Sequence, residues 1–361
     1  MADIREDGSE IFHYEIPDFP LSIKKNYIPA NIEFPELSIH WHEEIEITYV
    51  ISGSVDHQLN GKRVKLNAGE AIFINSKQLH LIQSDKVDCE LYCLIFNPTL
   101  LCASNYIAGK YVVPIIENEN LDYFYLKDDN EAHKPVLDAI IKIHELKGDD
   151  KFEFKSLEIL LGLWRSLFAI LPKIKANEVV VNEDLNKVKK MLSLVHRNYA
   201  ENIGLEQICA AGNVGKTKGT DLFYRFVNMT PVEYLINYRI EVASNMLLDT
   251  TDSVTDIAMA VGFSESSYFA RTFKSKMGMS PLKYRKTMKD IVELEHDGQW
   301  LALQETLREL RIPYKLIRIH AAVAITKSAS PSAIFSKASS YPVLINLTSV
   351  SGYSSSNFVF A

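Results

Sequence analysis

The stretch Ser253–Arg285, SVTDIAMAVGFSESSYFARTFKSKMGMSPLKYR, decides the fold of the C-terminal half of this 361-residue chain. Apolar residues at helical spacing predict a short helix that begins at the N-cap Ser253. Gly262 then supplies the positive φ of a tight turn. In the helix that follows, Phe269 and Phe273 are four residues apart and share the side that faces the core. The pattern predicts two short helices joined by a turn.

The outer face of the second of these helices is polar. Short polar groups near a helix N-terminus, with a long arginine one turn later, suit the reading of base edges and phosphates in a DNA groove. Residues 184–290 carry 15 Lys+Arg against 11 Asp+Glu, a net charge of +4, whereas the whole chain carries −7. We therefore predict double-stranded DNA as a partner of this half. The predicted contacts are Ser266, Ser267, Tyr268, Arg271 and Lys274.

The same plan occurs once more upstream. Leu222 and Phe226 occupy the places of Phe269 and Phe273, at a distance of 47 residues. Thr230-Pro231-Val232-Glu233 forms a capping box with proline at the first helical position, so a long helix that joins the two units is expected to begin there. The sequence predicts a duplicated helix-turn-helix in an all-α domain.

Residues 184–290 resemble the DNA-binding domain of the AraC/XylS family of bacterial transcription regulators. The resemblance rests on IAMAVGFSESSYFARTFKSKMGMSPLKYR and TPVEYLINYRIEVASNMLL. It implies two helix-turn-helix units that read adjacent major-groove segments, with Lys218 and Lys274 on phosphates. Phe223 and Tyr224 stand where polar or basic residues are usual in the family. The contacts implied in the first unit are Lys218, Thr220, Phe223 and Tyr224.

The front of the chain reads as strands. Over residues 20–100, β-branched and aromatic runs alternate with turn signals, among them Asn60-Gly61, which is typical of a two-residue hairpin. Several short strands at close spacing predict a sandwich or a small barrel.

Histidines and a glutamate lie at strand spacing in this region. His40, His42 and Glu46 have the same parity and are expected to face one side of a strand, with Thr48 on that side as well. Together with His80 they resemble the two motifs of the cupin barrel, whose metal-binding members use three His and one Glu. Three interpretations stay open: the lining of a pocket for a small effector such as a sugar, structural hydrogen bonding, and a metal site for Fe, Mn, Zn or Ni. We favour the effector pocket (His40, His42, Glu46, Thr48 and His80), with no resident metal or cofactor.

Helical periodicity marks residues 131–172 as a helical hairpin, which is either a homodimer interface or a cover for the barrel. Residues 173–183 read as a linker, and no role is predicted for the tail at 291–361. The acidic N-terminus is unlike a signal peptide, no apolar run could span a membrane, and the four cysteines suit a reducing cytoplasm. The protein is therefore expected in the cytoplasm.

These observations predict an α+β multidomain protein: a cupin-like β-barrel at 1–130 with its helical hairpin, and an all-α double helix-turn-helix domain at 184–290. The expected function is non-enzymatic, namely transcription regulation controlled by an effector in the barrel, with RNA polymerase as a further candidate partner. The alternative is a metal-dependent cupin enzyme, an oxygenase or isomerase, with an accessory helical domain.

Overall fold

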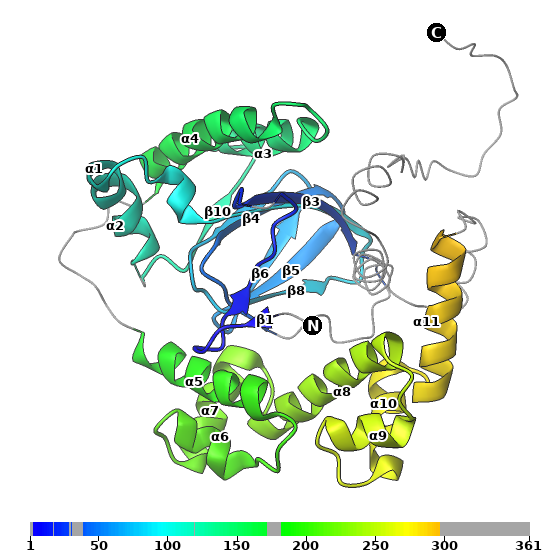
Figure 1. Ribbon diagram of the computed structural model, residues 1–361. Helices are drawn as coiled ribbons and strands as arrows, with labels where there is room; N and C mark the ends of the chain where they lie inside the picture. Colours follow the sequence, from blue (N-terminus) through cyan, green and yellow to red (C-terminus); the bar gives the residue numbers. More distant parts are fainter. Residues whose placement is uncertain are drawn as a thin grey trace, which may run out of the picture. The chain divides into compact units, whose positions relative to one another are not determined.

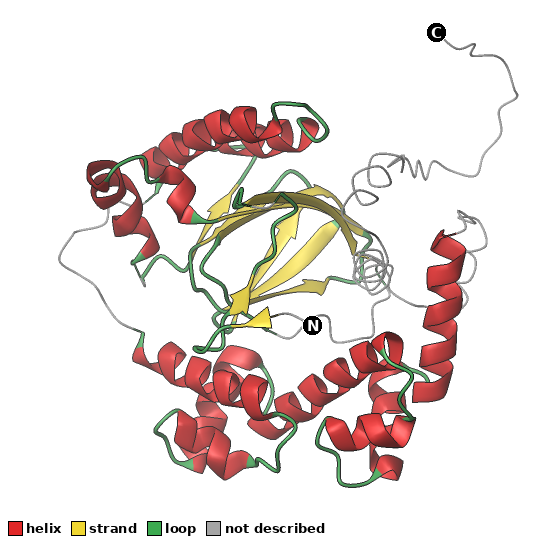
Figure 2. Cartoon of the chain, viewed as in Figure 1, coloured by secondary structure: helices red, strands yellow, loops and turns green. Residues whose placement is uncertain are grey.

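The N-terminal part of the chain consists mainly of antiparallel strands (Figures 1 and 2). The computed structural model describes residues 3–296, apart from 17, 29, 31–38, 119 and 172–181. Within that part the strands are β1 (Asp3–Ile4), β2 (Glu10–Ile11), β3 (Leu21–Ile28), β4 (Ile45–Ser52), β5 (Ser54–Leu59), β6 (Lys62–Asn67), β7 (Ala71–Ile74), β8 (His80–Ser84), β9 (Cys89–Phe96) and β10 (Tyr123–Leu126).

The predicted hairpin is confirmed at Asn60-Gly61. β5 ends at Leu59 and β6 begins at Lys62, and both turn residues have positive φ, 47° at Asn60 and 84° at Gly61. Such a turn matches the right-handed twist of the strands that it joins. The turn residues therefore fix the register of this hairpin.

The strands form two larger sheets with opposed inner faces. One sheet has the order β10-β7-β4-β9-β3 and the other β6-β5-β8, while β1 and β2 pair separately. Side chains that alternate along each strand divide into an interior cluster, which includes Val50 and Leu91, and an outer cluster, which includes Ile47 and Phe73. The five-stranded sheet is thus buried on both faces: one faces the interior of the predicted barrel, and the other is covered from outside.

The cover on that wall is helical. α3 (Lys134–Glu145) and α4 (Phe152–Ile170) run along the outer side of the five-stranded sheet (Figure 1), and their apolar residues join its outer cluster. Trp164 of α4, for example, packs against Phe73 and Phe96 and donates a hydrogen bond to the carbonyl of Tyr111. Short helical turns connect β9 to β10: η1 (Pro98–Leu101), α1 (Asn105–Ile107), η2 (Ala108–Val112) and α2 (Val113–Ile116).

The C-terminal half is helical, as predicted. Its helices are α5 (Glu183–Asn198), α6 (Leu205–Ala211), α7 (Lys216–Val227), α8 (Pro231–Asp249), α9 (Val254–Ala260), α10 (Ser266–Met277) and α11 (Pro281–His296). Ser253 caps α9, and Thr230 and Glu233 form the predicted capping box before α8. None of the helices in the described residues is long and apolar enough to span a membrane.

Gly219 lies where α6 and α7 pack closely. A Cβ at this position would lie 2.4 Å from the Sγ of Cys209 on α6. No real side chain tolerates that distance, so α6 and α7 approach each other closely only because residue 219 is glycine. The glycine belongs to the packing of the first unit.

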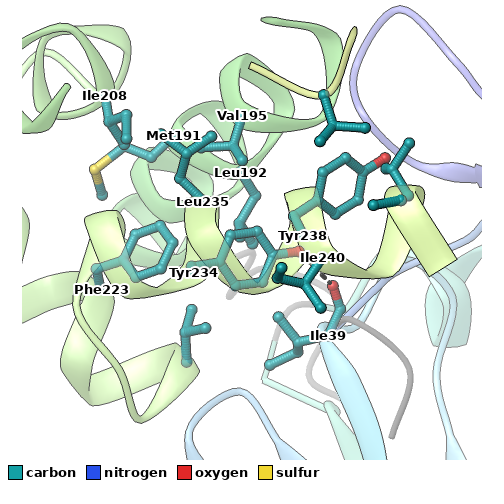
Figure 3. Close-up of a cluster of buried hydrophobic side chains, with 14 of the residues drawn as sticks. Ile39, Met191, Leu192, Val195, Ile208, Phe223, Tyr234, Leu235, Tyr238 and Ile240 are labelled. Atoms are coloured by element: carbon teal, nitrogen blue, oxygen red, sulfur yellow. Dashed lines mark hydrogen bonds between the residues drawn. The ribbon is translucent and has the colours of Figure 1, made fainter. Parts of the chain in front are cut away.

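The core of the C-terminal half also takes in residues from the barrel. Ile39, Trp41, Leu79 and Leu81 are buried in the same cluster as the apolar residues of α5–α10, and Figure 3 shows Ile39 beside the side chains of α8. By their contacts, residues Met1–Ala321 group as one compact unit. Most of the predicted linker at 173–183 and the tail beyond residue 296 lie outside the described residues.

His196 on α5 gives this core a pH dependence. Burial lowers the pKa of its imidazole from 6.5 to about 4, and its neighbours include the rings of Trp41, Tyr234 and Tyr238. The unfolded chain therefore binds a proton between these two pH values while the folded chain does not. The contribution of neutral His196 to the free energy of unfolding is fully present above about pH 6.5. It falls by about 3 kcal/mol as the pH drops toward 4.

We predict that His196→Phe reduces the loss of stability on acidification below about pH 6.5, because phenylalanine packs in the same place without binding a proton. The measurement is urea unfolding of both proteins at a series of pH values. Free energies of unfolding that fall in parallel for variant and wild type would show that another group is responsible.

Candidate functional site

Two backbone hydrogen bonds bring the predicted histidines together. The N–H of His40 donates to the carbonyl of His80 at 3.1 Å, and the N–H of His80 donates to the carbonyl of His40 at 2.9 Å. This antiparallel bridge places the two rings with their centroids 4.4 Å apart, and the ring of His42 lies 4.9 Å from that of His80. Three imidazoles from two distant parts of the sequence therefore meet.

Glu46 on β4 completes the cluster. Its Oε2 lies 3.3 Å from Nε2 of His80 and 3.6 Å from Nε2 of His42, and its Oε1 accepts a hydrogen bond of 3.0 Å from Thr48. The sequence parity that predicted one shared face is confirmed here, because Glu46 pairs with Ile74 and Ile95 on the barrel interior. All five predicted pocket residues thus lie together.

The charges in the cluster depend on one another. Burial alone would raise the pKa of Glu46, but the contacts with His42 and His80 outweigh burial and hold its pKa well below the usual range. Burial would likewise lower the pKa of His80, yet the carboxylate of Glu46 raises it. The Nδ1–H of His80 donates to the carbonyl of Gln78 at 2.8 Å, which directs Nε2 toward Glu46.

Two further carboxylates surround the histidines, and the sequence reasoning missed both. Oε2 of Glu44 lies 3.5 Å from Nδ1 of His42, and Oε2 of Glu10 lies 3.9 Å from Nε2 of His40. Burial raises the pKa of Glu10. Glu44 has the parity of His42 and Glu46, so its position could have been read from the strand pattern. Glu10 gave no such signal, because it arrives on a separate strand.

The N-terminal segment lies beside the cluster. Glu10 donates its backbone N–H to the carbonyl of Trp41 at 2.8 Å, the ring of Phe12 is 6.3 Å from that of His42, and Tyr14 donates to Glu44 at 2.8 Å. This segment thus contributes one carboxylate and two aromatic rings.

Several polar atoms in the cluster are buried without a hydrogen-bond partner among the described residues: Nδ1 and Nε2 of His42, Oε2 of Glu44 and Nε2 of His80. Their contacts of 3.3–3.6 Å are longer than the 2.7–2.9 Å or so of a charge-assisted hydrogen bond. Buried polar groups normally have partners, because leaving them unpaired costs about 1–3 kcal/mol each. Each of these atoms therefore keeps the capacity for a further hydrogen bond.

The same donor set fits a cation. One nitrogen from each of His40, His42 and His80 lies within 4.8 Å of the others, and Glu46 adds a carboxylate beside them. Imidazole and carboxylate ligands suit Zn, Fe, Mn or Ni. The donor set therefore matches the ligand types of a metal ion as well as the hydrogen-bonding groups of a polar molecule.

The second helix-turn-helix unit presents its predicted contacts as expected. On α10, Ser267, Tyr268, Arg271 and Lys274 are exposed and Ser266 is half-buried, while Phe269 and Phe273 are fully buried on the opposite side. The N-terminal end of this helix is therefore free to enter a groove.

The first unit requires one correction. Lys218 and Tyr224 on α7 are exposed and Thr220 is half-buried, but Phe223 is 0% exposed and packs edge-on against the ring of Tyr234. Phe223 cannot contact a base and belongs to the core. The apolar stripe of α7 is wider than the two positions Leu222 and Phe226 suggested, since residue 223 is adjacent to both around the helix.

Comparison with known proteins agrees with this division of the chain. A family model described as an AraC-like ligand binding domain matches residues 32–147, and a helix-turn-helix domain model matches residues 208–287, so the two together cover more than half of the sequence. The chain is 29% identical over 286 residues to the HTH-type transcriptional regulator YdeC of Bacillus subtilis, with 78% of this chain and 97% of the relative covered.

A second relative is the melibiose operon regulatory protein of Escherichia coli, which is 24% identical over 280 residues, with 74% of this chain and 91% of the relative covered. Among solved structures, fatty-acid-bound ToxT of Vibrio cholerae matches at 16% identity and a TM-score of 0.41, with 74% of this chain and 95% of that chain covered. Both sequence relatives are named as regulators, which favours the regulatory interpretation over a metal-dependent enzyme. The chain belongs to the AraC/XylS family of transcription regulators.

Proposed function

We propose that the protein is a sequence-specific transcription regulator whose DNA binding responds to a small polar effector held by the histidine cluster, defined as His40, His42, Glu46, Thr48 and His80. The observation that carries the proposal is the set of buried polar atoms that make no hydrogen bond within the described residues, in a chain with two exposed recognition helices. RNA polymerase stays a predicted partner from the family resemblance.

A sugar is the effector class that suits the cluster best. A hydroxyl group both donates and accepts, so neighbouring hydroxyls can pair with an imidazole nitrogen and with a carboxylate oxygen at once. Oε2 of Glu46 lies within 3.3–3.6 Å of two such nitrogens. The name of the melibiose operon regulatory protein, a relative of this chain, refers to a sugar operon.

A metal ion is the second candidate occupant, and the three converging imidazoles favour it. His40, His42, His80 and Glu46 would hold the ion, and a bound ion would supply a fixed positive charge that cancels the buried carboxylate. In that case the protein would respond to metal in place of a metabolite.

We predict that Arg271→Ala weakens binding to the preferred DNA sequence by about tenfold to a hundredfold and relaxes the base preference, because a bidentate arginine contact discriminates by about 1–3 kcal/mol. Tyr224→Ala should cost less, because a phenol offers one hydrogen-bonding group. The measurement is a gel-shift titration against a site selected from a randomised library.

Lys274→Ala is the control for a phosphate contact. It should lower the affinity equally for all DNA sequences and reduce the slope of log K against log salt concentration by about one. All three side chains are outside the core, so the melting temperatures should match. Equal losses of base preference for Arg271→Ala and Tyr224→Ala would show that the second unit is not the stronger reader.

We predict that a sugar or glycoside raises the melting temperature by roughly 3–4 °C at a concentration of about 100 Kd, because a ligand of the folded state stabilises it by about 2.7 kcal/mol. The measurement is a thermal-shift screen of mono- and disaccharides, glycosides and the chlorides of Zn, Mn, Ni and Co. Glu46→Gln should abolish the shift.

His144→Gln serves as the matched control, since His144 stacks on Tyr92 between α3 and the sheet, away from the cluster. A shift that survives Glu46→Gln would place the ligand elsewhere. A shift from a metal alone, lost in Glu46→Gln, would identify the metal as the occupant and reject the sugar.

A stripe on α4 is our proposed homodimer interface. Phe154, Leu161 and Phe168 are 76%, 47% and 39% exposed and recur every seven residues, on an exposed side of the helix that flanks the buried Leu160 and Leu167. Large apolar residues at this spacing form the seam of paired helices. Both alternatives for the hairpin are thereby combined, since its inner side covers the barrel.

We predict that Leu161→Lys converts a dimer into a monomer, because it places a charge in the middle of the apolar seam. Sedimentation velocity measures the change. Ala169→Lys, an exposed position beside the stripe, should remain dimeric. A wild-type protein that is monomeric at micromolar concentration would refute this interface.

A further inference from the structure

The backbone segments around His40 and His80 have side chains on two opposite faces, and each face belongs to a different part of the structure. Side chains alternate along extended backbone, so the neighbours of an inward residue point outward. His40, His42 and His80 meet in the cluster, whereas the residues next to them in sequence are buried in the core shared with the DNA-binding helices, where Figure 3 labels Ile39. These outward residues are Ile39, Trp41, Leu79 and Leu81. The cluster and that core are thus the two sides of the same short backbone segments.

Polar contacts join the same backbone to α5 and α8. Tyr234 donates its hydroxyl to the carbonyl of Ile39 at 3.4 Å, and Nε2 of His196 is 2.7 Å from that hydroxyl oxygen. The ring of Trp41 stacks on His196 with 6.0 Å between centroids. The carbonyl of Ile39 and the N–H of His40 belong to the same peptide unit, and that N–H bonds His80. A movement of the His40–His80 bridge therefore also displaces the carbonyl that accepts the hydrogen bond from Tyr234.

A second connection lies at the β5–β6 hairpin. Nε2 of Gln58 donates to the carbonyl of Phe226 at 3.0 Å, in the last turn of α7, where helix carbonyls lack partners of their own. A Cβ on Gly61 would lie 1.9 Å from the carbonyl oxygen of Arg225, so the hairpin touches the helix end directly. In the sheet, Leu59 between these two residues is paired with His80.

These contacts lie behind the reading face of α7. Tyr224 is 60% exposed and Lys218 is exposed as well, although Phe226 on the far side is buried against the barrel. The barrel therefore does not cover the side chains that face DNA. It sets the position of the helix that carries them.

We propose that Gln58, Gly61 and Trp41 form a coupling contact through which the state of the histidine cluster sets the position of the first helix-turn-helix unit. This inference rests on the proposed function, because it describes how an occupied cluster alters DNA affinity. The second unit makes no part of this contact. Regulation acts through the placement of α7, whose outer face stays open in either state.

The test is a double-mutant cycle on the full chain and needs no effector. His80→Gln perturbs the cluster, and Gly61→Ala disrupts the contact with Arg225. The matched control is Gly69→Ala: both glycines have φ of +84°, but a Cβ at residue 69 would meet only the side chain of Asp128. Binding to a DNA fragment selected with the wild-type protein is measured for each single and double variant.

His80→Gln should change the DNA dissociation constant at least about fivefold in the wild-type and Gly69→Ala backgrounds, since coupling between sites usually spans about 5- to 150-fold. In the Gly61→Ala background the change should fall below about twofold. An equal change in all three backgrounds, or none in the folded wild type, overturns the proposal. Should His80→Gln fail to fold, Thr48→Val perturbs Glu46 in its place.

The double-mutant cycle tests the coupling contact and the thermal-shift screen tests the proposed effector, so either proposal can be refuted without the other. Absence of any bound sugar or metal would remove the proposed effector and leave the coupling measurable. Absence of coupling, with a ligand still bound at the cluster, would leave the effector site in place and overturn only the contact proposed here.

Discussion

The reciprocal pair of backbone hydrogen bonds between His40 and His80 is the constraint on which the rest of the site depends. It holds two segments that are 40 residues apart in extended conformation, so that each contributes side chains to both of its faces. One face gathers imidazoles and carboxylates. The other supplies apolar residues to the helical core. Without the bridge neither face would be assembled.

The buried charges explain why such a cluster is compatible with a stable fold. A carboxylate removed from water is costly unless opposite charges and hydrogen bonds replace its hydration. Glu46 accepts a hydrogen bond from Thr48 and lies beside two imidazoles, and the contacts with His42 and His80 hold its pKa low despite burial. For the effector proposed above, such an arrangement would be preorganised, because the groups that would bind it are already removed from water.

Much of the fold followed from local rules. Asn60-Gly61 defined its hairpin, the capping box defined the start of α8, and strand parity placed Glu46 beside the histidines. Each of these depends on residues close in sequence. Glu44 obeyed the same parity and was overlooked, whereas Glu10 reaches the cluster on a separate strand that no periodicity connects to it.

Other features could not be predicted because periodicity shows which side of an element is apolar and not what covers it. The family resemblance implied a DNA contact for Phe223, but its ring packs against Tyr234 of α8 in the core. No sequence pattern indicated that Trp41 would stack on His196 of the helical half. In both cases the partner lies on another element, which periodicity within one element does not identify.

Gly61 limits which DNA-binding domains could be recombined with this barrel during the evolution of such regulators. Its hydrogen side chain lets the hairpin meet the backbone of Arg225, and Gln58 three residues earlier bonds the next carbonyl. A chimera that joins this barrel to the reader of another regulator would keep the hairpin but meet a different helix end. Sensor and reader are therefore matched at a backbone surface, and a functional graft must carry α7 together with the hairpin that fits it.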